Sequence, residues 1–190
     1  MLPADCVGSW RWVSISVGGV NDNEKILELL HSITSSGDLS HEKLEELATF
    51  NSGYGDTIGI RFTKASSDRV IATVHVSDKH LQITGIVNGG VYCSIAETVG
   101  SVMGIIASRG GVVVGVNNNT DFLKPVTAGV IEAEATVIRA GKTTQLINVD
   151  MTHRGSLVAR TTLRTMVRPK PANSNPGRRQ DKFSVGSDNR

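Results

Sequence analysis

The chain has 190 residues, of which 39% are hydrophobic and 20% are charged, and its formal net charge is +2. This length suffices for one domain with a substantial core and is short for two. From Arg168 to the end there are six Lys/Arg and two Asp/Glu, so this tail carries +4 and the remainder carries −2. A body with this charge argues against a nucleic-acid-binding protein, and we expect no nucleic-acid partner.

Cysteine usage and hydropathy give no sign of export, metal binding or membrane insertion. Cys6 and Cys93 lack the paired spacing that is typical of disulfide frameworks and metal sites. The N-terminus has no basic segment followed by an apolar run, which argues against a signal peptide. No stretch has the roughly 20 apolar residues of a membrane span. We therefore expect a cytoplasmic protein with no metal site and no membrane association.

Residues 1–54 are expected to form an N-terminal extension with two short helices. Asn21 or Asp22 could cap the first helix and Ser40 the second, because such side chains accept hydrogen bonds from the free amides of a helix start. Apolar residues at helical spacing follow each cap. We expect both helices to decorate the main domain rather than to form its centre.

Alternating apolar and polar residues indicate strands at 57–64 and 69–78, joined by a hairpin turn. The segment 89–106 is apolar on nearly all sides at helical spacing, which predicts a buried helix that begins at Gly89 and Gly90. Further strands are expected at 112–122, 130–140, 143–153 and 157–167. The Pro-, Asn-, Ser- and Arg-rich residues 169–190 are expected to form a disordered basic tail.

This order of elements predicts the fold of residues 55–168. A sheet must bury one face, and the wholly apolar helix is its natural filling. We therefore predict an α+β hotdog fold, in which an antiparallel β-sheet wraps around a central buried α-helix. One such layer leaves the helix partly uncovered, so we also expect the protein to dimerise.

Glu97 is the strongest candidate for a catalytic residue. It is the only formally charged residue between Leu81 and Ser108. A carboxylate in a buried helix is unfavourable unless it is paired or functional. Ser94 and Ser101, at positions −3 and +4, share its helical face. The alternative interpretation is therefore a structural Glu97 whose carboxylate these hydroxyls satisfy.

A second candidate feature is Asn88-Gly89-Gly90 at the predicted helix start. The first amides of a helix have no internal partner and carry the positive end of the helix dipole, so Gly89 and Gly90 could form an oxyanion hole. A flexible turn is the alternative. Glu97 lies eight residues beyond Gly89, which is about 12 Å along a helix. We therefore predict a site shared between two antiparallel helices at a dimer interface.

The stretch 81–104 resembles the core of the PaaI-like acyl-CoA thioesterases, which are related to 4-hydroxybenzoyl-CoA thioesterases with a catalytic Glu. The family pattern is roughly Q-P-x-G-x-x-H-G-G, followed by Glu or Asp and often by Gly-Ser. Two positions depart from it, since Asn88 replaces the usual His and Ile83 the usual Pro. The positions that match are Gln82, Gly85, Gly89, Gly90, Glu97, Ser101, Gly115, Asn119 and Pro125.

The resemblance implies a role for each matched residue. Gln82, Asn88 and Gly89 of one subunit would orient and polarise a thioester carbonyl. Glu97 of the partner would attack it or activate a water, and Ser101 would hold that water or the carboxylate. The implied assembly is a homodimer or a tetramer of two dimers. CoA is part of the substrate, so no separate cofactor is expected.

Four points concern alternative interpretations. Asn88 can donate a hydrogen bond but cannot act as an acid, which keeps a non-catalytic acyl-CoA-binding or regulatory protein as the alternative function. A hydratase is ranked last, because no His lies on the helix or just before it. Lys124, Arg139 and Lys142 lie on or beside turns and could bind CoA phosphates, or could be ordinary surface charges. The run 117–119 of three Asn could line the acyl pocket or face water at an edge.

Overall fold

The computed structural model describes residues 20–50, 53–109 and 111–168. The predicted tail at 169–190 and most of the first twenty residues lie outside them. Six antiparallel strands form one sheet in the order β1-β2-β4-β5-β6-β3. Their bounds are β1 Ile60–Ala65, β2 Arg69–Val76, β3 Val112–Phe122, β4 Gly129–Ala140, β5 Thr144–His153 and β6 Ser156–Arg168.

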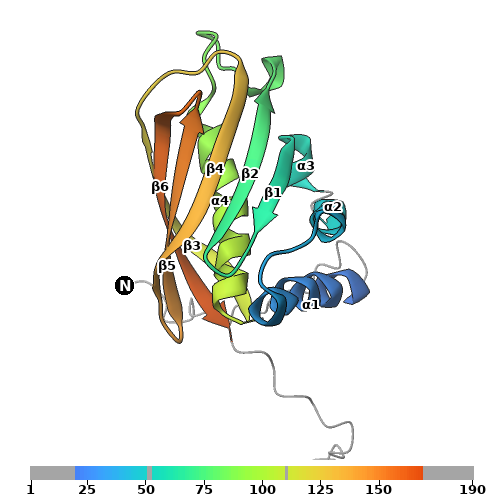
Figure 1. The fold of residues 1–190 in the computed structure, drawn as a ribbon. Helices are drawn as coiled ribbons and strands as arrows, with labels where there is room; N and C mark the ends of the chain where they lie inside the picture. The colour runs from blue at the N-terminus through green and yellow to red at the C-terminus, as the bar shows by residue number, and fades with distance from the viewer. Residues whose placement is uncertain (1–19, 51–52, 110, 169–190) are drawn as a thin grey trace, which may run out of the picture.

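The sheet curls around one long helix, α4, which runs from Gly89 to Ala107 (Figure 1). The strands curl around α4 because every second side chain along them points to the helix, and these side chains are mostly apolar. On β4, Ile131, Ala133 and Ala135 are buried. The chain therefore has the predicted α+β hotdog fold.

Glycines on α4 allow it to lie close to the sheet. A Cβ at Gly100 would be 2.6 Å from Leu163 Cδ2, and one at Gly104 would be 2.8 Å from Gln145 Oε1. Gln145 Nε2 also donates to the Gly104 carbonyl at 3.0 Å. By length and composition α4 is apolar enough to cross a membrane. Its place inside the curled sheet gives a sufficient reason for that composition.

The N-terminal helices cover one edge of the sheet. Helix α1 spans Val20–Ser36 and lies beside the lower end of α4, and helix α2 spans His41–Phe50 and lies beside β1 (Figure 1). The Leu39 amide donates to the Ala65 carbonyl at the end of β1, at 2.9 Å. The buried leucines of these helices join the main hydrophobic core, so the helices extend that core.

The start of β1 differs from the prediction. A strand was expected from residue 57, but Tyr54–Thr57 form a short helix, α3, and β1 begins at Ile60. Gly59 adopts a φ of 72° between them, which breaks any extended run at this point. After β2, a short 3₁₀ helix, η1 (Asp78–His80), leads toward α4.

The opposite edge of the sheet is free. Strand β3 pairs with β6 on one side, and no other described strand pairs with it. Val112, Val116 and Phe122 on this strand are 39%, 51% and 57% exposed. A long apolar edge strand is a template for pairing with another chain.

Candidate functional site

The loop before α4 is held by backbone hydrogen bonds and a buried histidine. Val87 N donates to Val126 O at 2.8 Å, and Asn88 N donates to His80 O at 2.9 Å. The His80 ring is buried, and its Nε2 lies 3.1 Å from the Ile58 carbonyl. These contacts fix the position at which α4 begins.

Asn88 caps α4, and this determines which helix-start donors are available. Its Oδ1 accepts a hydrogen bond from the Gly90 amide at 2.8 Å. The Gly90 amide, expected to serve a substrate, is therefore already occupied. Among the residues that the structure describes, neither the Gly89 amide nor Asn88 Nδ2 has a hydrogen-bond acceptor. The helix start thus offers two donors, Gly89 N–H and the Asn88 amide group.

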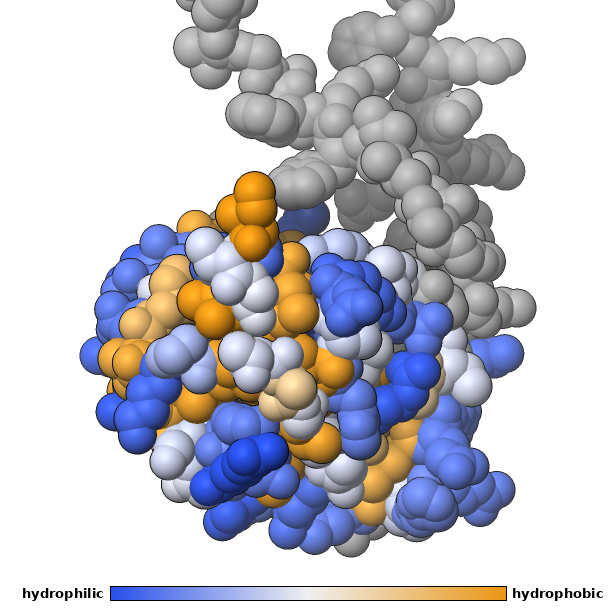
Figure 2. Space-filling model, turned by 90° about the horizontal axis from the view of Figure 1, so that it is seen from above, coloured by the Kyte–Doolittle hydropathy of each residue, from blue (hydrophilic) through white to orange (hydrophobic). Residues whose placement is uncertain are grey.

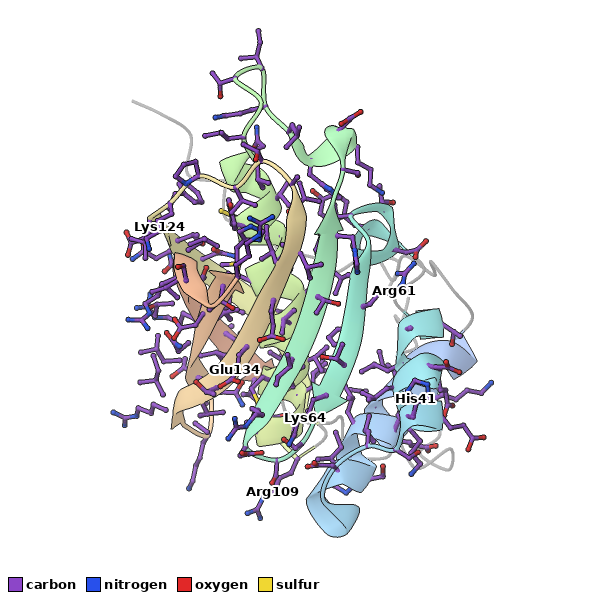
Figure 3. All side chains as sticks on the ribbon, turned by 45° about the horizontal axis from the view of Figure 1, so that its top comes forward. His41, Arg61, Lys64, Arg109, Lys124 and Glu134 are labelled. Atoms are coloured by element: carbon purple, nitrogen blue, oxygen red, sulfur yellow. The ribbon has the colours of Figure 1, made fainter. Side chains whose placement is uncertain are left out.

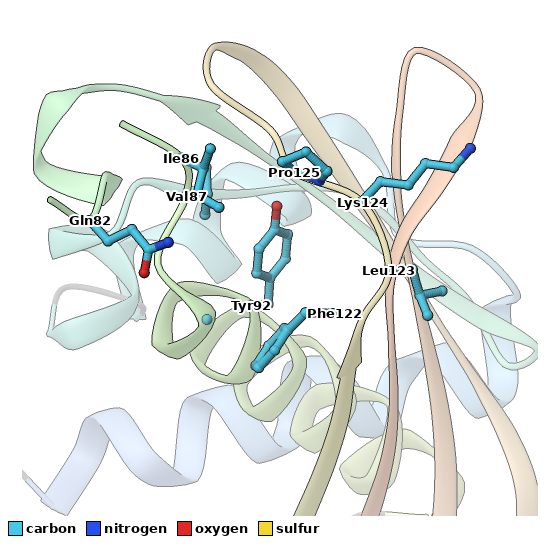
Figure 4. A pocket seen from close by; sticks show the side chains of 9 residues that line it. Gln82, Ile86, Val87, Tyr92, Phe122, Leu123, Lys124 and Pro125 are labelled. Carbon is cyan, nitrogen blue, oxygen red and sulfur yellow. The ribbon is translucent and has the colours of Figure 1, made fainter. Parts of the chain in front are cut away.

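A hollow of about 510 Å³ opens at this helix start (Figure 4). Figure 2 looks onto this end of the molecule and shows apolar surface between polar side chains. Gln82 lies at the hollow, with its Nε2 donating to Thr84 Oγ1 at 3.0 Å. We call this the helix-start hollow. Its lining residues are Gln82, Ile86, Val87, Gly89, Tyr92, Phe122, Leu123, Lys124 and Pro125.

Only one of the three basic candidates belongs to this hollow. Lys124 lines it and projects outward at the loop end of the molecule (Figures 3 and 4). Arg139 and Lys142 lie where β4 ends and turns into β5, at the opposite end of the sheet (Figure 1). Arg139 there lines a separate hollow with Arg164. Within one chain, the structure does not bring Arg139 or Lys142 near the start of α4.

Glu97 is half-buried and points toward the edge strand β3. A Cβ on Gly115 would overlap Glu97 Oε1, so a residue without a side chain is what leaves room for the carboxylate. Asn118 Nδ2 donates to Glu97 Oε2 at 3.3 Å and to the Cys93 carbonyl at 3.0 Å. The middle residue of the Asn run therefore faces the helix, whereas Asn117 and Asn119 are exposed.

The neighbouring serines do not satisfy the carboxylate. Ser94 Oγ donates to the Gly90 carbonyl at 2.7 Å and lies 3.1 Å from Tyr54 Oη. Ser101 is half-buried one turn after Glu97. In the described residues, neither hydroxyl forms a hydrogen bond with Glu97, so the carboxylate is not satisfied by these serines as the structural alternative supposed.

Glu97 lies in a second hollow, of about 310 Å³, which we call the carboxylate hollow. Its lining residues are Tyr54, Cys93, Ser94, Glu97, Thr98 and Asn118. Tyr54 was not predicted, because it comes from α3 and meets Ser94 across 40 residues of sequence. The two hollows share no lining residue.

Tyr92 is a titratable residue in the wall of the helix-start hollow. Burial raises the pKa of Tyr92, so its phenol is protonated at neutral pH. Within the described part of the chain, no three His, Cys, Asp or Glu residues are grouped in a way that could hold a metal ion. The arrangement offers hydrogen-bond donors at the start of α4 and one carboxylate further along it.

Known proteins with similar sequences and folds share this region. The family model described as Thioesterase superfamily matches residues 84–159. The Mycobacterium tuberculosis protein named "Putative esterase Rv1847" is 37% identical over 103 residues, which are 52% of this chain and 74% of that protein.

Solved structures of thioesterases are also similar to this chain. The Haemophilus influenzae "thioesterase HI1161" aligns with a TM-score of 0.64 and 30% identity over 69% of this chain and 94% of that chain. The E. coli PaaI protein aligns with a TM-score of 0.59 over 67% of this chain and 93% of that chain. Its identity is 21%, so that likeness shows the fold alone.

Proposed function

The chain belongs to the thioesterase superfamily, and from this premise we propose that it hydrolyses an acyl-CoA to a free acid and CoA. The observation that carries the proposal is the carboxylate of Glu97, which lies in a hollow against Gly115 beside the free edge of β3. A carboxylate can attack a thioester carbon or activate a water. CoA is part of the substrate, so the proposal needs no further cofactor.

The other half of the site would come from a second copy of the chain. About 12 Å of helix separate Gly89 from Glu97, too far for both to touch one thioester. Pairing of β3 with its counterpart about a two-fold axis would cover the free edge and set the two α4 helices antiparallel. The start of one α4 would then face Glu97 of the other, giving two sites per dimer. A tetramer would consist of two such dimers.

Glu97 could hydrolyse the thioester at such a site by two routes. In the first, a Glu97 oxygen bonds to the thioester carbon, the C–S bond breaks, CoA leaves as a thiolate, and water then hydrolyses the anhydride. In the second, Glu97 takes a proton from a water that attacks the same carbon, the C–S bond then breaks, and CoA leaves as a thiolate that takes up a proton. Negative charge develops on the thioester oxygen in both, and Gly89 N–H and Asn88 Nδ2 would donate to it. Gln82 would help to orient the carbonyl.

CoA phosphates need basic partners at the entrance. Lys124 is the candidate that this geometry supports, because it projects from the helix-start hollow into solvent. Arg139 and Lys142 could contribute only from another subunit of a larger assembly. A point charge on a flexible lysine stem suits a phosphate that binds outside the hollow.

Release of free thiol from a panel of acyl-CoAs tests the proposed reaction. We expect turnover by the wild type and loss of most of it in Glu97→Gln, which keeps the size of the side chain but cannot attack or accept a proton. Glu132→Gln is the matched control, because Glu132 is an exposed carboxylate on the outer face of β4. Full turnover by Glu97→Gln would show that Glu97 does not take part in the reaction.

Mixing two inactive variants tests whether the site is shared. Gly89→Pro lacks the helix-start amide hydrogen, and Glu97→Gln lacks the carboxylate. In a shared site, each mixed dimer contains one intact pair, so a randomised equal mixture should regain about a quarter of wild-type activity. A site within one chain would regain none.

An acyl-CoA-binding or regulatory protein is the second candidate function, and Asn88 favours it. An Asn has no acidic proton to give, and its Oδ1 is already bonded to Gly90. Tight binding of acyl-CoAs without thiol release over a broad range of chain lengths would support this candidate. An increase in turnover for Asn88→His would support the hydrolase.

A further inference from the structure

Within the part of the chain that the structure describes, the buried hydroxyl of Tyr92 has no hydrogen-bond partner. Tyr92 is 3% exposed, and its Oη is the one enclosed side-chain polar atom without a partner among the described residues. An unpaired buried hydroxyl is unfavourable, and folded proteins rarely keep one without a reason. This phenol therefore lacks a partner, and the described residues do not supply one.

The ring that carries this hydroxyl forms a wall of the helix-start hollow. Tyr92 lies three residues after Gly89, in the first turn of α4, and both residues line the hollow. The Phe122 ring lies 5.9 Å from the Tyr92 ring at 41°. Figure 4 shows the hydroxyl pointing away from the helix, between Val87 and Pro125. Val87 and Pro125, which flank the hydroxyl in this view, also line the hollow, so a group bound there lies next to the hydroxyl.

The walls of this hollow suit an acyl group better than the pantetheine arm of CoA. Pantetheine has two amides, and each would lose hydrogen bonds to water against walls such as Ile86, Val87 and Phe122. The apolar part of an acyl chain or ring loses no hydrogen bonds to water there. A thioester carbonyl bound at the Gly89 amide has its acyl side next to these walls, while the phosphates of CoA can extend past Lys124 into solvent.

Building on the proposed thioesterase function, we propose that Tyr92 is a specificity-determining residue whose hydroxyl binds an oxygen atom of the acyl group. The substrate is then an acyl thioester with a hydroxyl or keto group on an otherwise apolar body. A neutral phenol can donate to either group and can also accept from a hydroxyl. A site built around a buried polar group discriminates strongly against an analogue that leaves that group unpaired.

Matched pairs of substrates test this inference. Each pair has one skeleton with and without the oxygen, such as hydroxybenzoyl-CoA with benzoyl-CoA and 3-hydroxyhexanoyl-CoA with hexanoyl-CoA, with the oxygen moved along the skeleton in further pairs. For the best pair we expect wild-type kcat/KM to favour the oxygenated member about tenfold or more. In Tyr92→Phe the ratio should fall to near one, through slower turnover of the oxygenated member alone.

Two controls accompany the variant. Tyr54→Phe removes a phenol hydroxyl from the other hollow and should leave the ratio unchanged, whatever it does to the rates. Tyr92→Phe should melt no lower than the wild type, because it removes a hydroxyl that has no partner among the described residues.

Three results would overturn the inference. The first is a ratio that is the same in wild type and Tyr92→Phe. The second is an equal loss on both members of every pair, which would assign the hydroxyl to a part common to all thioesters. The third comes from non-hydrolysable thioether analogues measured by calorimetry, if oxygen does not improve binding or if Tyr92→Phe keeps the improvement. The chain could also release no thiol and still bind the oxygenated analogue more tightly in a way that depends on Tyr92. That result would support the contact between Tyr92 and the acyl oxygen and would refute only the proposed hydrolysis.

Discussion

The backbone of Gly115 on β3 borders the space that the carboxylate of Glu97 on α4 occupies. A Cβ at position 115 would overlap Glu97 Oε1. The edge strand β3 has no side chain at this position. The space this leaves allows α4 to direct the Glu97 carboxylate to the free edge.

Gly115→Ala should lower turnover far more than stability. The added methyl must displace the carboxylate, and a shift of about 1 Å at a reacting group is enough to cost roughly 100-fold in rate. The φ of Gly115 is outside the left-handed region, so the backbone accepts Ala and the melting temperature should change little. Thiol release and a thermal melt on one preparation measure both effects. Wild-type turnover would mean that Glu97 does not act from this position.

Asn118→Ala should reduce kcat about tenfold, because it removes the donor to Glu97 Oε2. Hydrogen bonds to charged groups contribute about 1.5–3 kcal/mol, and 1.4 kcal/mol corresponds to a factor of ten. Asn117→Ala is the matched control, since Asn117 is an exposed neighbour in the same run. Steady-state kinetics of the two variants make the comparison, and equal effects would deny Asn118 a positioning role.

The fold could be predicted from the sequence because its main elements have strong patterns. Residues 89–106 are apolar on nearly all sides at helical spacing, which predicts a buried helix, and residues 89–107 form it. The strands after it follow from alternation alone. The start of β1 could not be located in this way, because Ile58, Ile60 and Phe62 alternate like a strand although Gly59 turns the chain between the first two.

The site was predictable only where its residues belong to one segment. Gln82, Gly89 and Glu97 stand within 16 residues of one another. Asn118 could not be chosen from its run, because a β-bulge between Gly115 and Asn117 shifts the alternation. Arg139 lies near a turn, but turn residues do not reveal which end of the sheet they occupy. The sharing of the site between two chains stays a prediction.

A surface ion pair gives the fold a dependence on acid pH. Arg160 Nη2 on β6 donates to Asp150 Oδ2 on β5 at 2.7 Å. This hydrogen bond lowers the pKa of Asp150 from its ordinary value. A lowered folded-state pKa stabilises the fold above the unfolded pKa of about 4, and the contribution is lost as the pH falls through the lower value.

Asp150→Asn should therefore melt slightly below the wild type at pH 7. The difference should be at most about 1 kcal/mol, because the pair is partly exposed and solvent screens it. Thermal melts from pH 7 down to strongly acidic conditions should show the difference closing below about pH 4. A difference that is constant across that range would contradict the assignment to this pair.

Gly89 offers a direct test of the helix-start amide as an electrophilic donor. It is the first residue of α4, where proline is well tolerated, and Asn88 before it has the extended ψ of 138° that a following proline favours. Gly89→Pro removes the amide hydrogen, whereas Gly89→Ala keeps it. Both variants add a Cβ that would come within 2.8 Å of the Phe122 ring, which is 57% exposed and has room to move. Comparison of the two variants thus separates the effect of losing the amide hydrogen from the effect of crowding against Phe122. Because loss of one oxyanion donor costs about 10²–10³ in kcat, Gly89→Pro should fall that far below Gly89→Ala, and equal rates would remove this amide from the mechanism.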